Sequence, residues 1–172
     1  LTASGIIVAS NREANVLDLI DQLVQNYLPD LIAIRRDFHR HAEPGWLEFR
    51  TASLIARQLA DLGWNVSVGR AVIDADARMG VPTADTLDMA WQRAREQGGD
   101  PEYLPALQGG FTGVVGTLEA GPGPTIALRF DIDALEIAES EDPSHRPARE
   151  GFASMNRGVS HACGHDAHAA AG

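Results

Sequence analysis

The order of the hydrophobic patterns constrains the fold of this chain more than any other feature. Apolar residues recur at helical spacing over 16–27 and again from Pro29 toward His41, which predicts two helices in succession. A third helix is expected from about Thr51 to Leu62, because Gly63 is a favourable residue just beyond a helix end. The first part of the chain is therefore expected to be helical.

Short strands are expected after these helices. Residues 64–68 alternate between polar and apolar types, and 113–119 and 125–130 are predicted to form a hairpin around the glycine–proline turn at 121–124. The intervening 74–110 is charged and rich in turn formers, with one helix expected over 86–97, and is interpreted as an insertion on the surface. Helices followed by strands predict an α/β domain with a central sheet.

Composition narrows the class of protein. The 172 residues carry 24 acidic and 14 basic side chains, a net charge of −10, which argues against nucleic acid or an anionic membrane as a partner. The length is ordinary for one globular domain. The single cysteine suits a reducing compartment, and no signal sequence is recognised near the N-terminus, so a cytoplasmic protein is expected.

Residues 160–168 contain four side chains that can bind a metal. Cys163 and His165 are the candidate ligands, because thiolate and neutral imidazole suit zinc and similar divalent ions, and one intervening glycine lets both point to one side. The alternative is that Cys163 is a small buried apolar residue. The neighbouring histidines favour ligation.

Asp131 and Asp133 are the second candidates. Alternation along an extended segment places both carboxylates on one face, at the end of a predicted strand. One or both could instead cap the next element. A metal-bound histidine generally needs a carboxylate on its other ring nitrogen, and Asp133 could supply it to His165.

The remaining candidates carry weaker signals. Asp166 lies at a position that favours a helix N-cap, although a role near the metal is open. His161 could contact the metal ligands without binding the metal itself. His168 is as readily a solvated or packed side chain. His39 and His41 lie two apart on a helix, so they cannot chelate one ion together, and structural roles are favoured for them.

Four motifs in order resemble the metallopeptidase family M20, in its amidohydrolase subgroup. The similarity covers about residues 30–172, and the motifs lie at 35–43, 48–51, 129–135 and 161–166. The resemblance implies the N-terminal part of a zinc-peptidase-like catalytic domain over 1–172, with a central mixed sheet flanked by helices. The lid or dimerisation domain of the family is expected to lie outside this chain.

The resemblance also implies an activity. Members of the family hydrolyse the amide bond of an N-acyl or N-aroyl amino acid with two divalent ions, Mn²⁺ or Zn²⁺, and a glutamate as general base. By motif position Cys163 and His165 would bind metal, and Asp133 would act in the catalytic site. The general base and the other ligands are expected outside the 172 residues, so the chain alone is predicted to be inactive. A homologous second subunit or a homodimer is a further expectation.

Two other functions are compatible with the same residues. The chain could be a non-catalytic domain of the same fold that binds a metal or a partner. It could also be a hydrolase with Cys163 as nucleophile, although its histidine neighbours are too close in sequence for an unstrained triad. The metal-dependent amidohydrolase is favoured because it explains more of the cluster.

Overall fold

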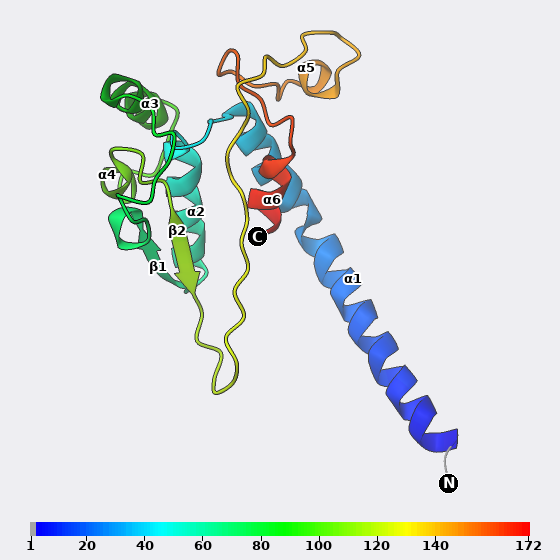
Figure 1. The fold of residues 1–172 in the computed structure, drawn as a ribbon. Coiled ribbons are helices and arrows are strands. Elements are labelled where there is room, and N and C mark those ends of the chain that lie inside the picture. The colour runs from blue at the N-terminus through cyan, green and yellow to red at the C-terminus, as the bar shows by residue number, and fades with distance from the viewer. Residues whose placement is uncertain (1–2) are drawn as a thin grey trace. The chain divides into compact units, whose positions relative to one another are not determined.

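The computed structural model describes the backbone of residues 3–172 and side-chain burial from residue 15 onward. The chain divides into two compact units, Leu1–Ile34 and Arg35–Gly172, and each is described by itself. The candidate site lies entirely in the second unit. Figure 1 shows the elements along the chain.

The first helix, α1, runs from Ala3 to Arg40 without interruption and contains Pro29. The prediction of two helices that separate at Pro29 was therefore wrong. A proline removes one backbone donor and disturbs the preceding turn, but the apolar repeat continues on both sides and the helix propagates through it. Among the described residues, no helix combines the length and the hydropathy needed to cross a membrane.

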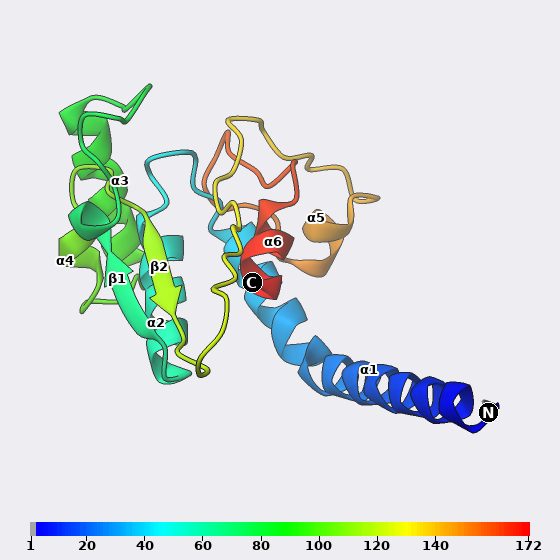
Figure 2. The same cartoon turned by 60° about the horizontal axis from the view of Figure 1, so that its bottom comes forward.

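A helix and two strands form the first part of the second unit. Helix α2 spans Phe49–Asp61, and it packs against β1 (Asn65–Val68) and β2 (Val114–Thr117), as Figure 2 shows. The strands are antiparallel, with Asn65 opposite Thr117 and Val68 opposite Val114. The short helix η1 (Gly69–Ala71) follows β1 directly. Helix α2 was predicted within two residues at each end, and β1 within one.

The predicted hairpin of 113–119 with 125–130 was wrong. Strand β2 pairs with β1 instead, and residues 125–130 form no strand, with Ile126 82% and Leu128 77% exposed. Alternation of polar and apolar residues predicts an extended backbone but does not say which strand will pair with it. Here residues 69–113 connect β1 to β2 and bring the two strands side by side. The α/β class is confirmed, with a sheet of two strands in the part of the chain that the structure describes.

Residues 74–110 contribute to the hydrophobic core and are not a surface excursion. They contain α3 (Ala84–Glu96) and α4 (Leu104–Leu107), and Thr83 caps α3 through its hydroxyl. Five of their apolar residues are buried together with three from 47–52. The cluster consists of Leu47, Phe49, Ala52, Leu87, Ala90, Ala94, Leu104 and Leu107. Whether 74–110 is an insertion relative to other proteins stays a prediction.

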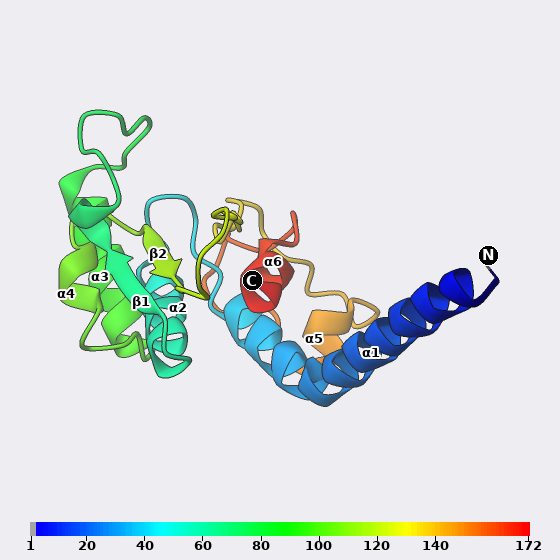
Figure 3. The same ribbon diagram turned by 90° about the horizontal axis from the view of Figure 1, so that it is seen from below.

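The C-terminal part of the unit carries α5 (Arg146–Glu150) and α6 (His165–Ala171). Figure 3 shows the segment after β2 passing between α2 and α6 on its way to α5. Two isolated bridges fix this segment: Pro44 pairs with Ala134 in parallel, and Leu135 with Ser160 in antiparallel orientation. The preceding Asp133 lies beside α6, because its side chain contacts His165 at the start of that helix.

Candidate metal centre

The structure brings Asp133 and His165 together. Oδ1 of Asp133 lies 2.9 Å from Nδ1 of His165, and the carbonyl oxygen of Asp133 lies 3.0 Å from the same nitrogen. His165 begins α6 directly after Gly164, whose φ of 88° is a left-handed conformation that favours glycine. Because Nδ1 is occupied by Asp133, Nε2 of His165 is the nitrogen left for a metal.

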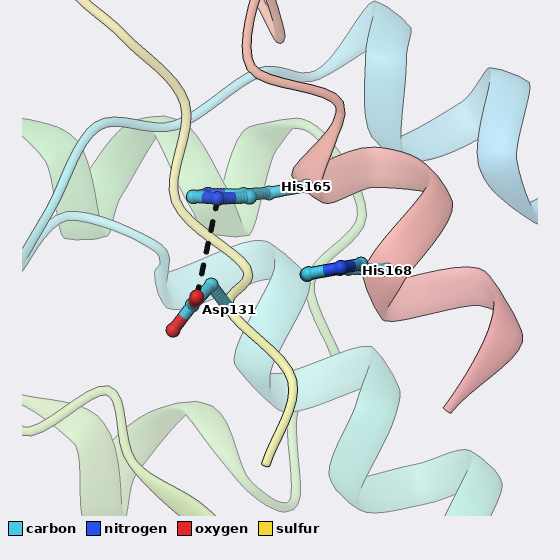
Figure 4. A group of neighbouring side chains, drawn as sticks. All are labelled: Asp131, His165 and His168. Atoms are coloured by element: carbon cyan, nitrogen blue, oxygen red, sulfur yellow. Dashed lines mark ion pairs between the residues drawn. The ribbon is translucent and has the colours of Figure 1, made fainter.

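Asp131, His165 and His168 form the group best placed to bind a metal among the described residues. Each offers one ligand atom, and these atoms all lie within 4.8 Å of one another. Figure 4 shows both imidazoles on α6 facing Asp131, with Nε2 of His165 4.0 Å from Oδ2 of Asp131. The two rings are stacked, with centroids 5.6 Å apart and planes at 12°. His168, which the sequence favoured only weakly, thus joins the group.

Cys163 lies beside this group but is not one of its three members. Its side chain is exposed, and Sγ lies 3.9 Å from the carbonyl oxygen of Asp133, the atom that also faces His165. The two candidate ligands from the sequence therefore flank one backbone oxygen. The role of Cys163 as a metal ligand stays a prediction.

Two buried glutamates, Glu43 and Glu48, lie near the segment that carries Asp133. Glu43 is fully buried and accepts hydrogen bonds from the backbone N–H groups of Arg50 and Thr51, and its own carbonyl accepts from Ala134 N–H. Burial raises the pKa of Glu48 to about 7, and the nearby charges of Glu43 and Asp133 act in the same direction. The hydroxyl of Thr112 donates to Glu48 and opposes that shift. Both glutamates belong to the sequence motifs, but nothing local in the sequence indicated their burial.

Asp166 is not the N-cap of α6. Gly164 occupies that position, and Asp166 lies in the first turn, where its carboxylate accepts from Ala167 N–H and suits the positive end of the helix dipole. Its Oδ2 lies 2.6 Å from Nε of Arg35 and 2.8 Å from Nδ1 of His39. Burial opposes ionisation, but these partners lower the pKa of Asp166. The carboxylate therefore ties the start of α6 to the end of α1.

His39 has a structural role, as the sequence favoured. Its Nδ1 faces Asp166, and its Nε2 lies 2.7 Å from Oε1 of Glu139. Burial alone would lower the pKa of His39, but the two carboxylates outweigh it and raise the pKa. Glu139 also accepts from His145 and from Ser154 N–H. The sequence did not indicate Glu139, because its buried partner His39 lies 100 positions away.

The arrangement can hold a divalent cation. Imidazole nitrogens and carboxylate oxygens are suitable ligands for zinc or manganese, and a carboxylate on the second nitrogen of His165 would orient the ring and raise its basicity. A bound ion in such a site polarises a carbonyl and lowers the pKa of a bound water. That is the chemistry of amide hydrolysis.

Comparison with known proteins agrees with this chemistry. The chain is 53% identical over 157 residues to "Indole-3-acetyl-aspartic acid hydrolase" of Enterobacter agglomerans, covering 91% of this chain and 36% of that protein. No protein-family model matches the chain. The chain is therefore related to hydrolases, and the resemblance to amidohydrolases is confirmed.

Among hydrolases, the chain is also similar to proteins that are named for aminobenzoyl-glutamate. The chain is 50% identical over 157 residues to one of the subunits of p-aminobenzoyl-glutamate hydrolase from Escherichia coli, covering 91% of this chain and 36% of that protein. The crystal structure of the "Aminobenzoyl-glutamate utilization protein" from Klebsiella pneumoniae is similar, with a TM-score of 0.66 and 55% identity. That match covers 67% of this chain and 29% of the other. The chain spans about a third of the length of these relatives.

Proposed function

We propose that this chain forms part of the catalytic domain of a metal-dependent amidohydrolase of the M20 family. Its substrate is an N-acyl or N-aroyl amino acid, with p-aminobenzoyl-glutamate as the first candidate. The products are the free acid, here p-aminobenzoate, and glutamate. The observation that carries the proposal is the group of Asp131, His165 and His168 with Asp133 on the second nitrogen of His165.

The proposed roles follow from chemistry and position. Cys163 and His165 bind a divalent ion, Mn²⁺ or Zn²⁺, of which the complete site takes two. Asp131 and His168 are further ligand candidates, because each offers an atom within 4.8 Å of a ring nitrogen of His165. Asp133 holds the imidazole of His165 in the orientation that presents Nε2. When bound, the metal polarises the amide carbonyl and activates water.

The similarity to two hydrolases of amino-acid conjugates supports the substrate class. One of these relatives is named as a subunit of its enzyme, which supports a partner, either a homologous subunit or a second copy of the chain. The single cysteine, free and exposed, suits the reducing cytoplasm, which we propose as the location.

The test uses an enzyme that contains this chain and follows the release of p-aminobenzoate from p-aminobenzoyl-glutamate. A strong chelator should abolish turnover, and added Mn²⁺ or Zn²⁺ should restore it. His165→Ala should also abolish turnover, whereas His41→Ala, whose imidazole bonds to the carbonyl of Asp37 outside the metal group, should not. Turnover that survives the chelator would contradict the metal mechanism and favour Cys163 as a nucleophile.

The 172-residue chain alone is expected to release no p-aminobenzoate above the uncatalysed rate, even with metal added. The general base that the family resemblance implies does not lie in its motifs. Release by the chain alone at the rate of a longer relative would show that a base is present among these residues.

A further inference from the structure

A cavity lies in the Arg35–Gly172 unit, and the proposed chemistry does not use it. Its volume is about 510 Å³, within the range of small-molecule sites. Charged and polar side chains from three separate segments line it, at the end of α1, around α5 and before Cys163. They are Arg35, His39, Glu139, His145, Arg146 and His161.

Two arginines and one carboxylate line the cavity, although the whole chain carries a net charge of −10. Glu139 is the one carboxylate among the lining residues. Its oxygens already accept from His39, His145 and the backbone N–H of Ser154. Its oxygens are therefore occupied, and the guanidinium groups of Arg35 and Arg146 are the positive charges of the wall.

Both arginines have N–H donors that bond to no acceptor among the described residues. Within the described residues, Arg146 bonds through Nε to Glu150, and Arg35 contacts Asp166 through Nε, so their terminal nitrogens remain for another acceptor. Glu150 also bonds to Arg36 and Arg149, and one carboxylate cannot neutralise three guanidinium groups. Arg146 therefore shares its carboxylate partner with two other arginines.

His161 adds a second, independent observation. Only 5% of its surface is exposed, and neither ring nitrogen has a hydrogen-bond partner within the described residues. Buried polar atoms without partners are rare in folded proteins, and they commonly mark a place where a ligand or water belongs. Apolar side chains complete the wall, since Ile137, Pro147 and Phe152 also line the cavity.

We propose that this cavity binds a small organic carboxylate. Its carboxylate oxygens accept hydrogen bonds from the terminal nitrogens of Arg35 and Arg146, and its apolar or aromatic part lies against Ile137. Planar guanidinium groups suit a carboxylate, and charge-assisted hydrogen bonds give the site its selectivity for anions. The lining residues include His161 and Ala162, which directly precede Cys163, but none of Asp131, His165 and His168. The proposal does not depend on the proposed amidohydrolase activity.

The experiment is calorimetric titration of the 172-residue chain with benzoate, in the presence of a chelator that removes divalent metals. Acetate, which has the same charge but no aromatic part, and inorganic phosphate are titrated in parallel. Saturable binding of benzoate is expected at millimolar concentration, with weaker binding of both others. The ring proton resonances of His145 and His161 should shift on addition of benzoate, and those of His168 should not.

Arg146→Gln and Arg149→Gln form a matched pair. Both side chains are exposed, at 66% and 58%, and both contact Glu150, but only Arg146 lines the cavity. Loss of a charged hydrogen bond should weaken benzoate binding at least about tenfold in Arg146→Gln. Arg149→Gln should stay within about twofold of the parent chain, the small effect expected of a surface charge.

Four outcomes would overturn the proposal. They are absence of saturable benzoate binding, equal weakening in the two variants, tighter binding of phosphate than of benzoate, and loss of binding when the metal is removed. The third would indicate an inorganic anion site, and the fourth would place the carboxylate at the metal centre. Circular dichroism of each variant establishes that the fold is unchanged.

Discussion

Oδ2 of Asp166 lies 2.8 Å from Nδ1 of His39, although 127 positions separate the two residues in the sequence. The same oxygen lies 2.6 Å from Nε of Arg35, and the side chain of Asp166 has no exposed surface. Asp166 follows His165 directly and precedes His168 by two positions. The ion pairs of one buried carboxylate thereby fix the turn of α6 that presents both imidazoles of the metal group.

Asp166→Asn should destabilise the chain by roughly 3 kcal/mol, because removing one charge from a buried pair leaves its partners uncompensated. Urea denaturation measures the change. Asp61→Asn is the matched control, since Asp61 is 66% exposed and lies 3.9 Å from Arg57, so it should cost less than about 0.5 kcal/mol. Equal losses in the two variants would show that the buried pairs contribute nothing specific.

Glu48→Gln should change the dependence of stability on pH. Burial raises the pKa of Glu48 from 4.5 to about 7 in the folded chain, so its contribution to stability is full below pH 4.5 and is lost as pH rises through 7. Glutamine removes this loss and can still accept the hydrogen bond from Thr112. The variant should therefore be more stable than the parent chain at pH 8, by up to roughly 3 kcal/mol.

At pH 5 the same two proteins should differ much less, because most of the Glu48 carboxyl is protonated in the folded chain. Urea denaturation at both pH values gives the comparison. Other groups titrate as well: the pKa of His39 is raised, and burial lowers the pKa of His161 to about 4. These groups are common to both proteins and cancel in the difference. A difference that is the same at pH 5 and pH 8 would refute the assignment to Glu48.

Leu87→Ala should destabilise the chain by about 2–5 kcal/mol, the usual cost of a cavity in a packed core. Met89→Ala, two residues further along α3, should have little effect. Leu87 is 7% exposed and belongs to the hydrophobic core, whereas Met89 is 74% exposed. Thermal unfolding of the two variants measures the contrast. Similar melting temperatures would mean that 74–110 lies on the surface after all.

Cys163→Ser should remove one equivalent of metal from the protein, and His165→Ala should do the same, as measured by elemental analysis after dialysis against Mn²⁺ or Zn²⁺. Serine is a much poorer ligand than thiolate for these ions. The His168→Ala variant tests the alternative set. If it loses metal while Cys163→Ser does not, then Asp131, His165 and His168 hold the ion without the thiol.

Elements with local signals could be predicted from the sequence. The apolar repeat and Gly63 located α2, and the expected helix over 86–97 corresponds to α3 at Ala84–Glu96. Pairing could not be predicted, because alternation in 113–119 does not state which strand lies beside it, and the partner proved to be β1. At Pro29 a local signal gave the wrong prediction. A proline usually ends a helix, but here the apolar repeat continues past it and the helix is unbroken.

In the candidate site, too, some contacts could be predicted from the sequence and others could not. The need of a bound imidazole for a carboxylate correctly led from His165 to Asp133, thirty-two positions away. The contact of His39 with Asp166 and Glu139 could not be inferred, because each of the three residues has an ordinary local role by itself. The position of His168 depended on the helix start at Gly164, which turns both imidazoles of α6 to one side.

The stretch from residue 125 to 130 has a practical consequence for anyone who purifies this chain. Within the described residues its amide and carbonyl groups form no backbone hydrogen bonds, and Ile126 and Leu128 face solvent. A row of unpaired backbone groups flanked by large aliphatic side chains is a template for strand addition between molecules. We therefore expect concentrated solutions to aggregate, and a lysine in place of Leu128 to delay the onset of light scattering.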